Sequence, residues 1–446
     1  MRSIWNKQVC IPGRNRLSGD LDTEVAVIGA GMAGILTAYY LAREGKEVVV
    51  LEAASIGSGQ TCGTTAKITS QHGLIYHRLL TDRGSHMMKL YGESNQKAVR
   101  EYGRLIKDRS ISCHFEKRPA FLYTMEQQNA VHLEAIAARQ AGLPALEVIE
   151  TELPFSVKRA LRFEDQASFH PMKFIEALSL SLTVFEHTPA LAVKGHAIRT
   201  PYGTVTARKI VFACHYPFPL IPGYYFARMY QERSYVLALL GAPRLDGMYL
   251  GVDPEGLSFR RAGQTLLLGG ESHRTGVEKS HPYRALTASA NKLFPQARVC
   301  ARWSAQDCIT LDSAPYIGRF SRRERDWYVA TGFGKWGMTL SMVSAHLLTD
   351  LICQRTSPYE ALYSPRRLPV LSALPRLADH MVQSSKGLIK GLSPKIMRCP
   401  HMGCKLSWNG AESTWDCPCH GSRFDSSGKL ITGPSQTSCH CHKLIP

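Results

Sequence analysis

The sequence contains no internal repeat with a period of about 20 to 50 residues, which argues against a solenoid or propeller. It also has no apolar segment near its N-terminus typical of a secretory signal, so we expect a cytoplasmic protein. The longest uncharged window, residues 25–42, is interrupted by glycines and followed by a second apolar run, which argues against a membrane span. No basic-aromatic pattern typical of nucleic-acid binding is present, so no nucleic-acid partner is expected.

Acidic residues are scarce, with 36 Asp and Glu against 54 Lys and Arg, and the formal net charge is +18. This excess permits weak attraction to an acidic partner or to an anionic membrane face, so a peripheral membrane contact stays open. With 44% hydrophobic residues in 446, the chain is globular and long enough for two or three domains.

A dinucleotide-binding pattern lies near the start of the chain. Gly29, Gly31 and Gly34 follow a predicted strand over residues 24–28 and open a predicted helix over 32–44. Glu52 ends the next predicted strand. Glycines let backbone N–H groups approach a pyrophosphate at the helix N-terminus, and the carboxylate accepts hydrogen bonds from ribose hydroxyls. Together these features predict a site for FAD or NAD, and the carboxylate disfavours NADP.

A second glycine pattern, Gly332, Gly334 and Gly337, also lies between a predicted strand and a predicted helix. No further strand with a terminal acid follows it, so a separate nicotinamide site is not expected. The helix beginning near Met338 instead offers a positive N-terminus, which suits the electron-rich pyrimidine end of a reduced flavin.

The segments 56–67, 266–271, 312–318 and 330–339, added to the first glycine motif, resemble the D-amino-acid-oxidase-like family of FAD-dependent oxidoreductases. The resemblance spans nearly all of residues 21–356 and implies oxidation of C–N or C–O bonds by hydride transfer to FAD. It places the stretch 57–67 along the pyrophosphate and flavin, and the stretch 332–339 at the pyrimidine end. The cofactor-binding residues implied in this way are Gly59, Thr61, Thr65, Lys67, Gly332, Gly334, Gly337 and Met338, with Val193 at the adenine.

The resemblance assigns no catalytic residue, because substrate-side residues vary within the family. Polar residues near the flavin-like motifs or in the β-rich block are candidates, although a structural role is the better expectation for each. These candidates are His72, Arg228, Tyr230 and Tyr235.

Six of the 13 cysteines lie between residues 399 and 441, interleaved with histidines. Cys399 and His401 form a Cys-x-His pair, and Cys417 and His420 form a Cys-x-x-His pair. Two thiolates and two imidazoles suit a [2Fe–2S] cluster in which one iron takes both cysteines and the other both histidines. Structural zinc also takes Cys2His2 ligand sets and is the alternative.

The segments 399–404 and 415–425, with Gly433 and Pro434, resemble a Rieske domain. The resemblance implies a disulfide between Cys404 and Cys419, and it gives Ser422 the role of a hydroxyl that donates to a cluster sulfide. Rieske domains place several strands before the first cluster loop, and here only a few residues precede it. Either the preceding linker supplies replacement packing or the cluster is unstable. The Cys- and His-rich tail, residues 439–442, is not part of the pattern.

The expected fold is α/β: a doubly wound FAD-binding Rossmann-like domain with an inserted antiparallel-sheet substrate domain, followed by a small, shortened all-β Rieske domain. Residues 75–145 are predicted to be mostly helical, and 186–275 mostly β. The expected divisions are a leader (1–20), the oxidoreductase domain (21–356, with FAD-binding parts about 21–80, 186–215 and 300–356), a Pro-rich linker (357–395) and the Rieske-like domain (396–446).

The linker carries apolar residues at helical spacing, beside basic ones, and we expect this helix to dock on the main domain. The apolar stripe consists of Leu374, Leu377, Ala378, Met381 and Val382. A helix lying on a membrane surface is the weaker alternative.

The sequence predicts an oxidoreductase that oxidises a small amine, amino acid or hydroxy compound and passes electrons from FAD to a Rieske [2Fe–2S] cluster, and then to an unknown acceptor. Two alternatives stay open: a flavin and iron–sulfur redox sensor or electron-transfer module without a metabolic substrate, and an NAD-dependent dehydrogenase with a zinc-bound tail.

Overall fold

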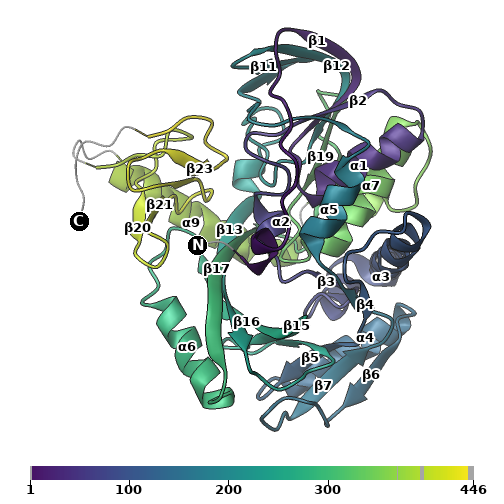
Figure 1. Cartoon of the computed structure of the whole chain (residues 1–446), viewed down its shortest axis with the longest axis vertical. Helices are drawn as coiled ribbons and strands as arrows, with labels where there is room; N and C mark the ends of the chain where they lie inside the picture. The colour runs from purple at the N-terminus through teal and green to yellow at the C-terminus, as the bar shows by residue number, and fades with distance from the viewer. Residues whose placement is uncertain (1–2, 369, 392–395, 440–446) are drawn as a thin grey trace.

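In the computed structural model, the residues described are 3–368, 370–391 and 396–439 (Figure 1). The predicted strand–helix–strand unit is present as β1 (Leu21–Ile28), α1 (Met32–Arg43) and β2 (Val48–Leu51). β1 is almost entirely apolar and buried in its second half, as expected for a parallel strand covered on both faces. The unit forms the centre of the first large sheet.

The first sheet has eight strands, in the order β10-β11-β12-β1-β2-β9, with β19 paired to β12 and β18 to β19. Pairing is parallel between β12, β1, β2 and β9 and between β12 and β19. The added strands are β9 (Thr183–Phe185), β10 (Ala192–Lys194), β11 (Ala197–Thr200), β12 (Gly203–Phe212), β18 (Tyr316–Arg319) and β19 (Trp327–Thr331). The helices α1, α5 (Pro171–Ser179) and α7 (Gly337–Ile352) lie beside this sheet (Figure 1).

The second sheet also has eight strands, in the order β17-β13-β16-β15-β14-β5-β7-β6, and all its pairs but β14 with β5 are antiparallel. It confirms the predicted substrate-side sheet. Its strands are β5 (Ala120–Thr124), β6 (Ala145–Val148), β7 (Arg159–Phe163), β13 (Met229–Leu240), β14 (Met248–Gly251), β15 (Ser258–Ala262), β16 (Thr265–Arg274) and β17 (Arg298–Thr310). The helices α4 (Gln128–Gln140) and α6 (Pro282–Leu293) accompany it.

The expectation of mostly helical structure over 75–145 is only partly correct. The long helix α3 (Tyr76–Asp108) and α4 are present, but β4 (Glu116–Lys117) and β5 lie between them. All five residues of β5 are buried, so the run has no alternation of apolar and polar residues that would mark it as a strand. A three-stranded sheet joins β4 to β3 (Lys67–Ile68) and β8 (Ala167–Ser168).

The leader packs against the stretch 57–67, the expected flavin loop. Trp5, in the short helix η1 (Ile4–Lys7), is 2% exposed, and its indole nitrogen donates to the carbonyl of Thr64 at 2.7 Å. Its ring lies edge-on to His170 and under the guanidinium of Arg260. The polar composition of residues 1–20 concealed this aromatic anchor.

The C-terminal part forms a four-stranded antiparallel sheet of short strands, β20 (Ser407–Asn409), β21 (Thr414–Asp416), β22 (Arg423–Phe424) and β23 (Leu430–Thr432). Its small core is made mainly of cysteines, Leu406 and Phe424. The linker helix α9 (Leu374–Gly391) runs beside this sheet (Figure 1), and the amide of Lys405 donates to the carbonyl of Gly387. The linker therefore supplies part of the packing that the shortened domain lacks.

The remaining short helices are α2 (Gln60–Gly63) in the expected flavin loop, α8 (Glu360–Tyr363) in the linker, η2 (Tyr225–Ala227) and η3 (Leu371–Ala373). No helix among residues 3–368, 370–391 and 396–439 has the length and apolarity that crossing a bilayer requires. Of the 439–442 tail, residues 440–442 lie outside the described residues, as do the linker prolines at 369 and 394.

Candidate functional site

The first glycine motif forms a tight turn between β1 and α1. Gly29 has a φ of +106°, and a Cβ there would lie 2.7 Å from the carbonyl oxygen of Ala213 on the neighbouring strand. A Cβ on Gly34 would lie 1.8 Å from the carbonyl oxygen of Gly29. Gly31 caps α1 and has no side chain with which to bond the helix N-terminus, where the amide of Met32 donates to Thr61 instead. The remaining amides of the first turn of α1 keep the positive partial charge that a pyrophosphate site requires.

Glu52 lies beside this turn at the end of β2. Its carboxylate accepts from the amides of Ala30 at 2.7 Å and Ala54 at 2.8 Å. Burial raises the pKa of Glu52, while the two amides oppose the shift. A carboxylate oxygen has two lone pairs, so the group retains acceptor capacity for a ribose hydroxyl.

The flavin loop is tied to the glycine turn at one side chain. The hydroxyl oxygen of Thr61 accepts from the amide of Met32 at 3.0 Å, and a Cβ on Gly31 would lie 3.3 Å from the same oxygen. Gly59 caps α2, and the carbonyl of Thr65 accepts from Arg260. The structure thus brings Thr61 next to the glycine motif, while Gly59 lies just before α2 and Thr65 contacts the substrate-side sheet.

Lys67 and Val193 lie farther from the glycine turn. The ammonium of Lys67 donates to the carbonyl of Tyr249 and to the hydroxyl of Ser258, both at 2.7 Å, in the substrate-side sheet. Burial lowers the pKa of Lys67 to about 7. Val193 is in β10, opposite Ile198, at one edge of the first sheet. The Lys67 side chain therefore reaches the substrate-side sheet, and β11 and β12 separate Val193 from β1, the strand that leads into the glycine turn.

The second glycine motif forms the turn between β19 and α7. Gly332 and Gly334 have φ values of +74° and +54°, and Gly337 is the first residue of α7. The hydroxyl of Thr339, in the first turn of α7, accepts from the amide of Thr69 and donates to its carbonyl. The end of the flavin loop and the N-terminus of α7, including Met338, are therefore held together.

The four polar candidates all have structural partners. His72 is buried, lies within 2.7 Å of the Tyr91 hydroxyl and stacks on Trp336, and burial lowers its pKa to about 3. Arg228 donates to the carbonyl of Pro365. The hydroxyl of Tyr230 donates to Glu232. Tyr235 contacts His273. None of them stands out as a catalytic base.

A pocket of about 360 Å³ lies between β13 and α9. The pocket is lined by two carboxylates, two guanidinium groups, a phenol and a proline. These belong to Glu232, Asp379, Arg274, Arg376, Tyr230 and Pro375. Glu232 is 3.0 Å from the ammonium of Lys335 in the second glycine turn and is the cross-strand partner of Asp307. Burial raises the pKa of Asp307 to about 6. Sequence inspection missed this cross-strand pair, because its two members are 75 positions apart in the chain.

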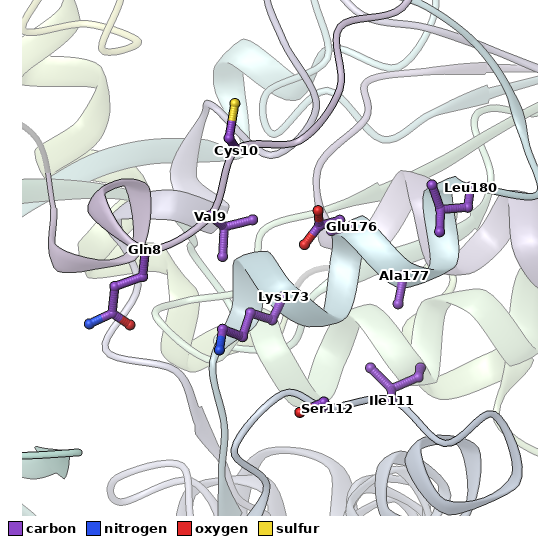
Figure 2. Close-up of a pocket in the computed structure, with 9 residues that line it drawn as sticks. All are labelled: Gln8, Val9, Cys10, Ile111, Ser112, Lys173, Glu176, Ala177 and Leu180. Carbon is purple, nitrogen blue, oxygen red and sulfur yellow. The ribbon is translucent and has the colours of Figure 1, made fainter.

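A second hollow, of about 440 Å³, is drawn in Figure 2. Side chains of α5, among them Lys173 and Glu176, lie between the leader segment 8–10 and the segment 111–112. It contains no residue of the glycine motifs or the cluster loops.

The C-terminal ligand set is gathered on two adjacent loops. Cys399 and Cys417 are each 1% exposed, and the rings of His401 and His420 lie 5.0 Å apart, edge to face. The Nδ1 atoms of both histidines are buried without a hydrogen-bond partner. Buried polar atoms are rarely left unpaired, so these nitrogens fit iron ligands.

The electrostatics of the loops favour metal ligation as well. A hydrogen bond with Cys417 lowers the pKa of the Cys399 thiol to about 7, and burial lowers the pKa of His401 to about 4 and that of His420 well below its usual range. The same hydrogen bond, with burial, raises the pKa of the Cys417 thiol well above its usual range. Metal ligation needs thiolates and neutral imidazoles, so the shifts of Cys399 and the two histidines suit the set and that of Cys417 opposes it.

The implied disulfide between Cys404 and Cys419 is present and braces the two loops. The sulfur atoms of Cys404, Cys419 and Cys417 all lie within 4.8 Å of one another. Two of the three are bonded together, so this trio is not itself a set of metal ligands. Ser422 is fully buried, and its hydroxyl oxygen accepts from the amide of Ser435 and also contacts Cys399.

Two glutamines of the substrate-side sheet hold the second cluster loop. The side-chain amide of Gln231 donates to the carbonyl of His420 at 2.6 Å, and that of Gln306 donates to the carbonyl of Gly421 at 2.7 Å. The backbone amide of Gln306 donates to the side-chain oxygen of Gln60 in α2, at 2.7 Å. One residue therefore joins the expected flavin loop to the cluster loop, and no sequence motif marks it.

A buried ion-pair network lies beside these glutamines. Arg233 in β13 is 3.3 Å from Asp416 in β21, and neither side chain is more than 1% exposed. Arg423 lies 3.3 Å from the other oxygen of Asp416. This largely buried network joins β13 of the substrate-side sheet to β21 and β22 of the C-terminal sheet.

Comparison with known proteins agrees with these sites. The model of the family described as FAD dependent oxidoreductase matches residues 24–351, and that of the Rieske [2Fe-2S] domain matches residues 392–443. The chain is 34% identical to YhfW of Bacillus subtilis (strain 168), which bears the name of a Rieske 2Fe-2S iron-sulfur protein. That alignment covers 97% of this chain and 96% of YhfW.

A short part of the chain is similar to the cytochrome b6-f complex iron-sulfur subunit of Trichodesmium erythraeum (strain IMS101), with 50% identity over 40 residues. Those residues are 9% of this chain and 22% of that subunit. Among solved structures, glycine oxidase from Geobacillus kaustophilus matches with a TM-score of 0.66 and 19% identity, over 78% of this chain and 99% of that one. L-proline dehydrogenase from P. horikoshii matches with a TM-score of 0.65 and 18% identity, over 79% and 98%. These two structures show the fold alone.

Proposed function

This chain belongs to the FAD-dependent oxidoreductase family and carries a C-terminal Rieske [2Fe–2S] domain, and we propose that it oxidises a small amine, amino acid or hydroxy compound and delivers the electrons to its own cluster. When bound, the flavin accepts a hydride from the carbon next to nitrogen or oxygen, and the cluster carries single electrons onward. An external acceptor then receives two electrons per substrate molecule, one at a time.

The observation that carries this proposal is the position of Gln306. Its backbone is bonded to Gln60 in the expected flavin loop, and its side chain is bonded to Gly421 in the cluster loop. Electron transfer between cofactors depends on a short, fixed separation. A direct hydrogen-bonded connection between the two loops supports transfer within the docked chain.

The pocket between β13 and α9 supports an amino acid as substrate. Glu232 and Asp379 offer carboxylates to a protonated amine, and Arg274 and Arg376 offer guanidinium groups to a carboxylate. Lys335 connects this pocket to the second glycine turn through its ion pair with Glu232. The neighbouring folds named for glycine oxidation and proline dehydrogenation make those two amino acids the first compounds to test.

The test is anaerobic mixing of the purified holoprotein with a panel of amino acids, amines and hydroxy acids. Flavin absorbance reports substrate oxidation, and the electron paramagnetic resonance signal of the reduced cluster reports internal transfer. We expect both to appear with one compound class. A flavin that is bleached while the cluster stays oxidised excludes internal transfer.

The alternative of a sensor or electron-transfer module predicts a different outcome. In that case no compound of the panel reduces the flavin, whereas photochemical reduction of the flavin still reduces the cluster. The Rieske domain match favours an iron–sulfur cluster over zinc, and analysis for iron and acid-labile sulfide tests this directly.

A further inference from the structure

Helix α9 turns its small and polar residues towards the protein and its apolar residues towards solvent, the reverse of a helix that covers a core. The residues that face the protein recur every seven positions and are small or polar. They are Ala373, just before the helix, His380 and Gly387, and together they form a narrow seam. His380 contacts the carbonyl of Phe226, and a Cβ on Gly387 would lie 2.8 Å from the sulfur of Cys419.

The apolar residues of α9 face solvent. Leu374, Met381 and Val382 are 53%, 51% and 49% exposed, and Ile389 is 68% exposed. Their spacing of seven, eight and fifteen positions from Leu374 places them on one face at 3.6 residues per turn. The helix docks on the main domain by its other side, so most members of the stripe 374–382 are exposed.

The exposed strip continues beyond the helix. Leu368 and Leu371, in the segment leading into α9, are 81% and 84% exposed. A globular protein rarely leaves six large aliphatic side chains of one segment in water unless something covers them.

The charge at the edge of this face is positive. Lys386, four positions after Val382 on α9, is exposed there, and Lys405 is exposed beside the seam, where its amide is bonded to Gly387. The described acidic residue of the helix, Asp379, lies 3.6 Å from Arg274. The chain as a whole carries a formal charge of +18.

We propose that this face, consisting of Leu368, Leu371, Leu374, Met381, Val382 and Ile389, binds the surface of a bilayer that contains anionic lipids. The helix has the character of an interfacial helix: a strong division between apolar and polar faces, low overall hydrophobicity and basic residues at the edge. Lipid chains cover the aliphatic side chains, and the headgroups attract the lysines.

This binding orients the Rieske part. The seam of α9 touches the disulfide-braced loop at Cys419, so the cluster loops lie about one helix diameter, roughly 10 Å, from the lipid surface. The inference stands independently of substrate oxidation, because it rests only on the exposed face of α9 and the charge around it.

The test is co-sedimentation of the full-length holoprotein with vesicles. Vesicles of phosphatidylcholine containing phosphatidylglycerol are compared with vesicles of phosphatidylcholine alone. We expect binding to the anionic vesicles, weaker binding at high salt, and about a tenfold loss of partitioning in the double variant Met381→Gln with Ile389→Gln.

The matched control is Ile149→Gln with Leu180→Gln, which removes two aliphatic side chains of 72% and 62% exposure far from α9. It should bind vesicles like the unaltered protein. Flavin and cluster absorbance, recorded for every variant, show that the fold is kept.

Three outcomes overturn the proposal: no binding of the unaltered protein to anionic vesicles, equal binding by the α9 variant, or equal binding to neutral vesicles. Light scattering gives the oligomeric state of the same samples. If the unaltered protein does not bind vesicles and forms a dimer that the α9 substitutions dissociate, the face binds a second copy of the chain instead.

Discussion

The side-chain amide of Gln306 donates a hydrogen bond to the carbonyl of Gly421, so a strand of the substrate-side sheet directly holds the loop that carries His420. The same amide also donates to Gln231, whose own amide bonds the His420 carbonyl. Both glutamines are 2% exposed or less. The position of the cluster loop thus depends on two buried, mutually bonded side chains.

We expect Gln306→Leu to slow reduction of the cluster by the flavin. The change removes two donors and leaves the acceptors at Gly421 and Gln231 unpaired, which costs about 1–3 kcal/mol for each buried group. Flavin reduction by substrate should keep its rate, while cluster reduction in stopped-flow absorbance falls by about tenfold or more. An unchanged second phase would show that Gln306 has no part in transfer.

Asp416→Asn is expected to destabilise the docked arrangement by about 3–5 kcal/mol, because it leaves Arg233 as a buried, uncompensated cation, while Arg423 keeps Glu412 at 3.6 Å. Chemical denaturation followed by cluster absorbance measures the effect. The double variant Arg233→Met with Asp416→Leu, which removes both members of the pair, should lose less. If the single variant is as stable as the parent, the network does not hold the interface.

Cys417→Ser should abolish the cluster while FAD stays bound, since the thiolate is one of the four ligands we propose and the expected nucleotide site lies in another sheet. Iron and labile sulfide analysis, with flavin absorbance at the same time, checks this. Cys300→Ser is the matched control, because Cys300 is exposed and remote from the loops. Equal iron content in the two variants would contradict the ligand assignment.

The contribution of Glu134 to the stability of the chain should fall as pH rises from about 4.5 to 7. This carboxylate accepts from the amides of Tyr76 and His77 at the start of α3, and burial raises its pKa from 4.5 to about 7. A pKa raised by folding means that the native state binds the proton more tightly, so the contribution is complete below about 4.5 and is lost as pH passes 7.

This shift corresponds to roughly 3 kcal/mol. Glu134→Gln cannot ionise, so its thermal unfolding temperature should change less between pH 5 and pH 8 than that of the parent. Parallel pH profiles for the two proteins would rule out this assignment.

The sequence predicted the elements that have a local signature. The turn at Gly29, Gly31 and Gly34 demands glycine, and the ligand spacing at Cys399 and Cys417 demands two loops, so both could be found from residues alone. The doubly wound domain, the substrate-side sheet and the small Rieske sheet were predicted correctly, as were the two cofactors.

What the sequence could not predict depends on contacts between distant segments. Gln306 and Gly421 are 115 positions apart, and a buried glutamine in a strand has no motif. The direction in which α9 faces depends on the small residues at its seam, because Gly387 permits the close approach to Cys419. The apolar stripe alone favoured the opposite orientation.

The ion pair between Arg367 and Asp312 determines where the expressed chain can be truncated. Arg367 bonds both oxygens of the Asp312 carboxylate, and the two side chains are 5% and 3% exposed. A truncation after residue 356, at the compositional boundary, would remove the guanidinium that bonds both oxygens and leave this buried carboxylate paired with Arg83 through one oxygen. An expression fragment meant to yield the flavin half by itself should therefore extend past Arg367.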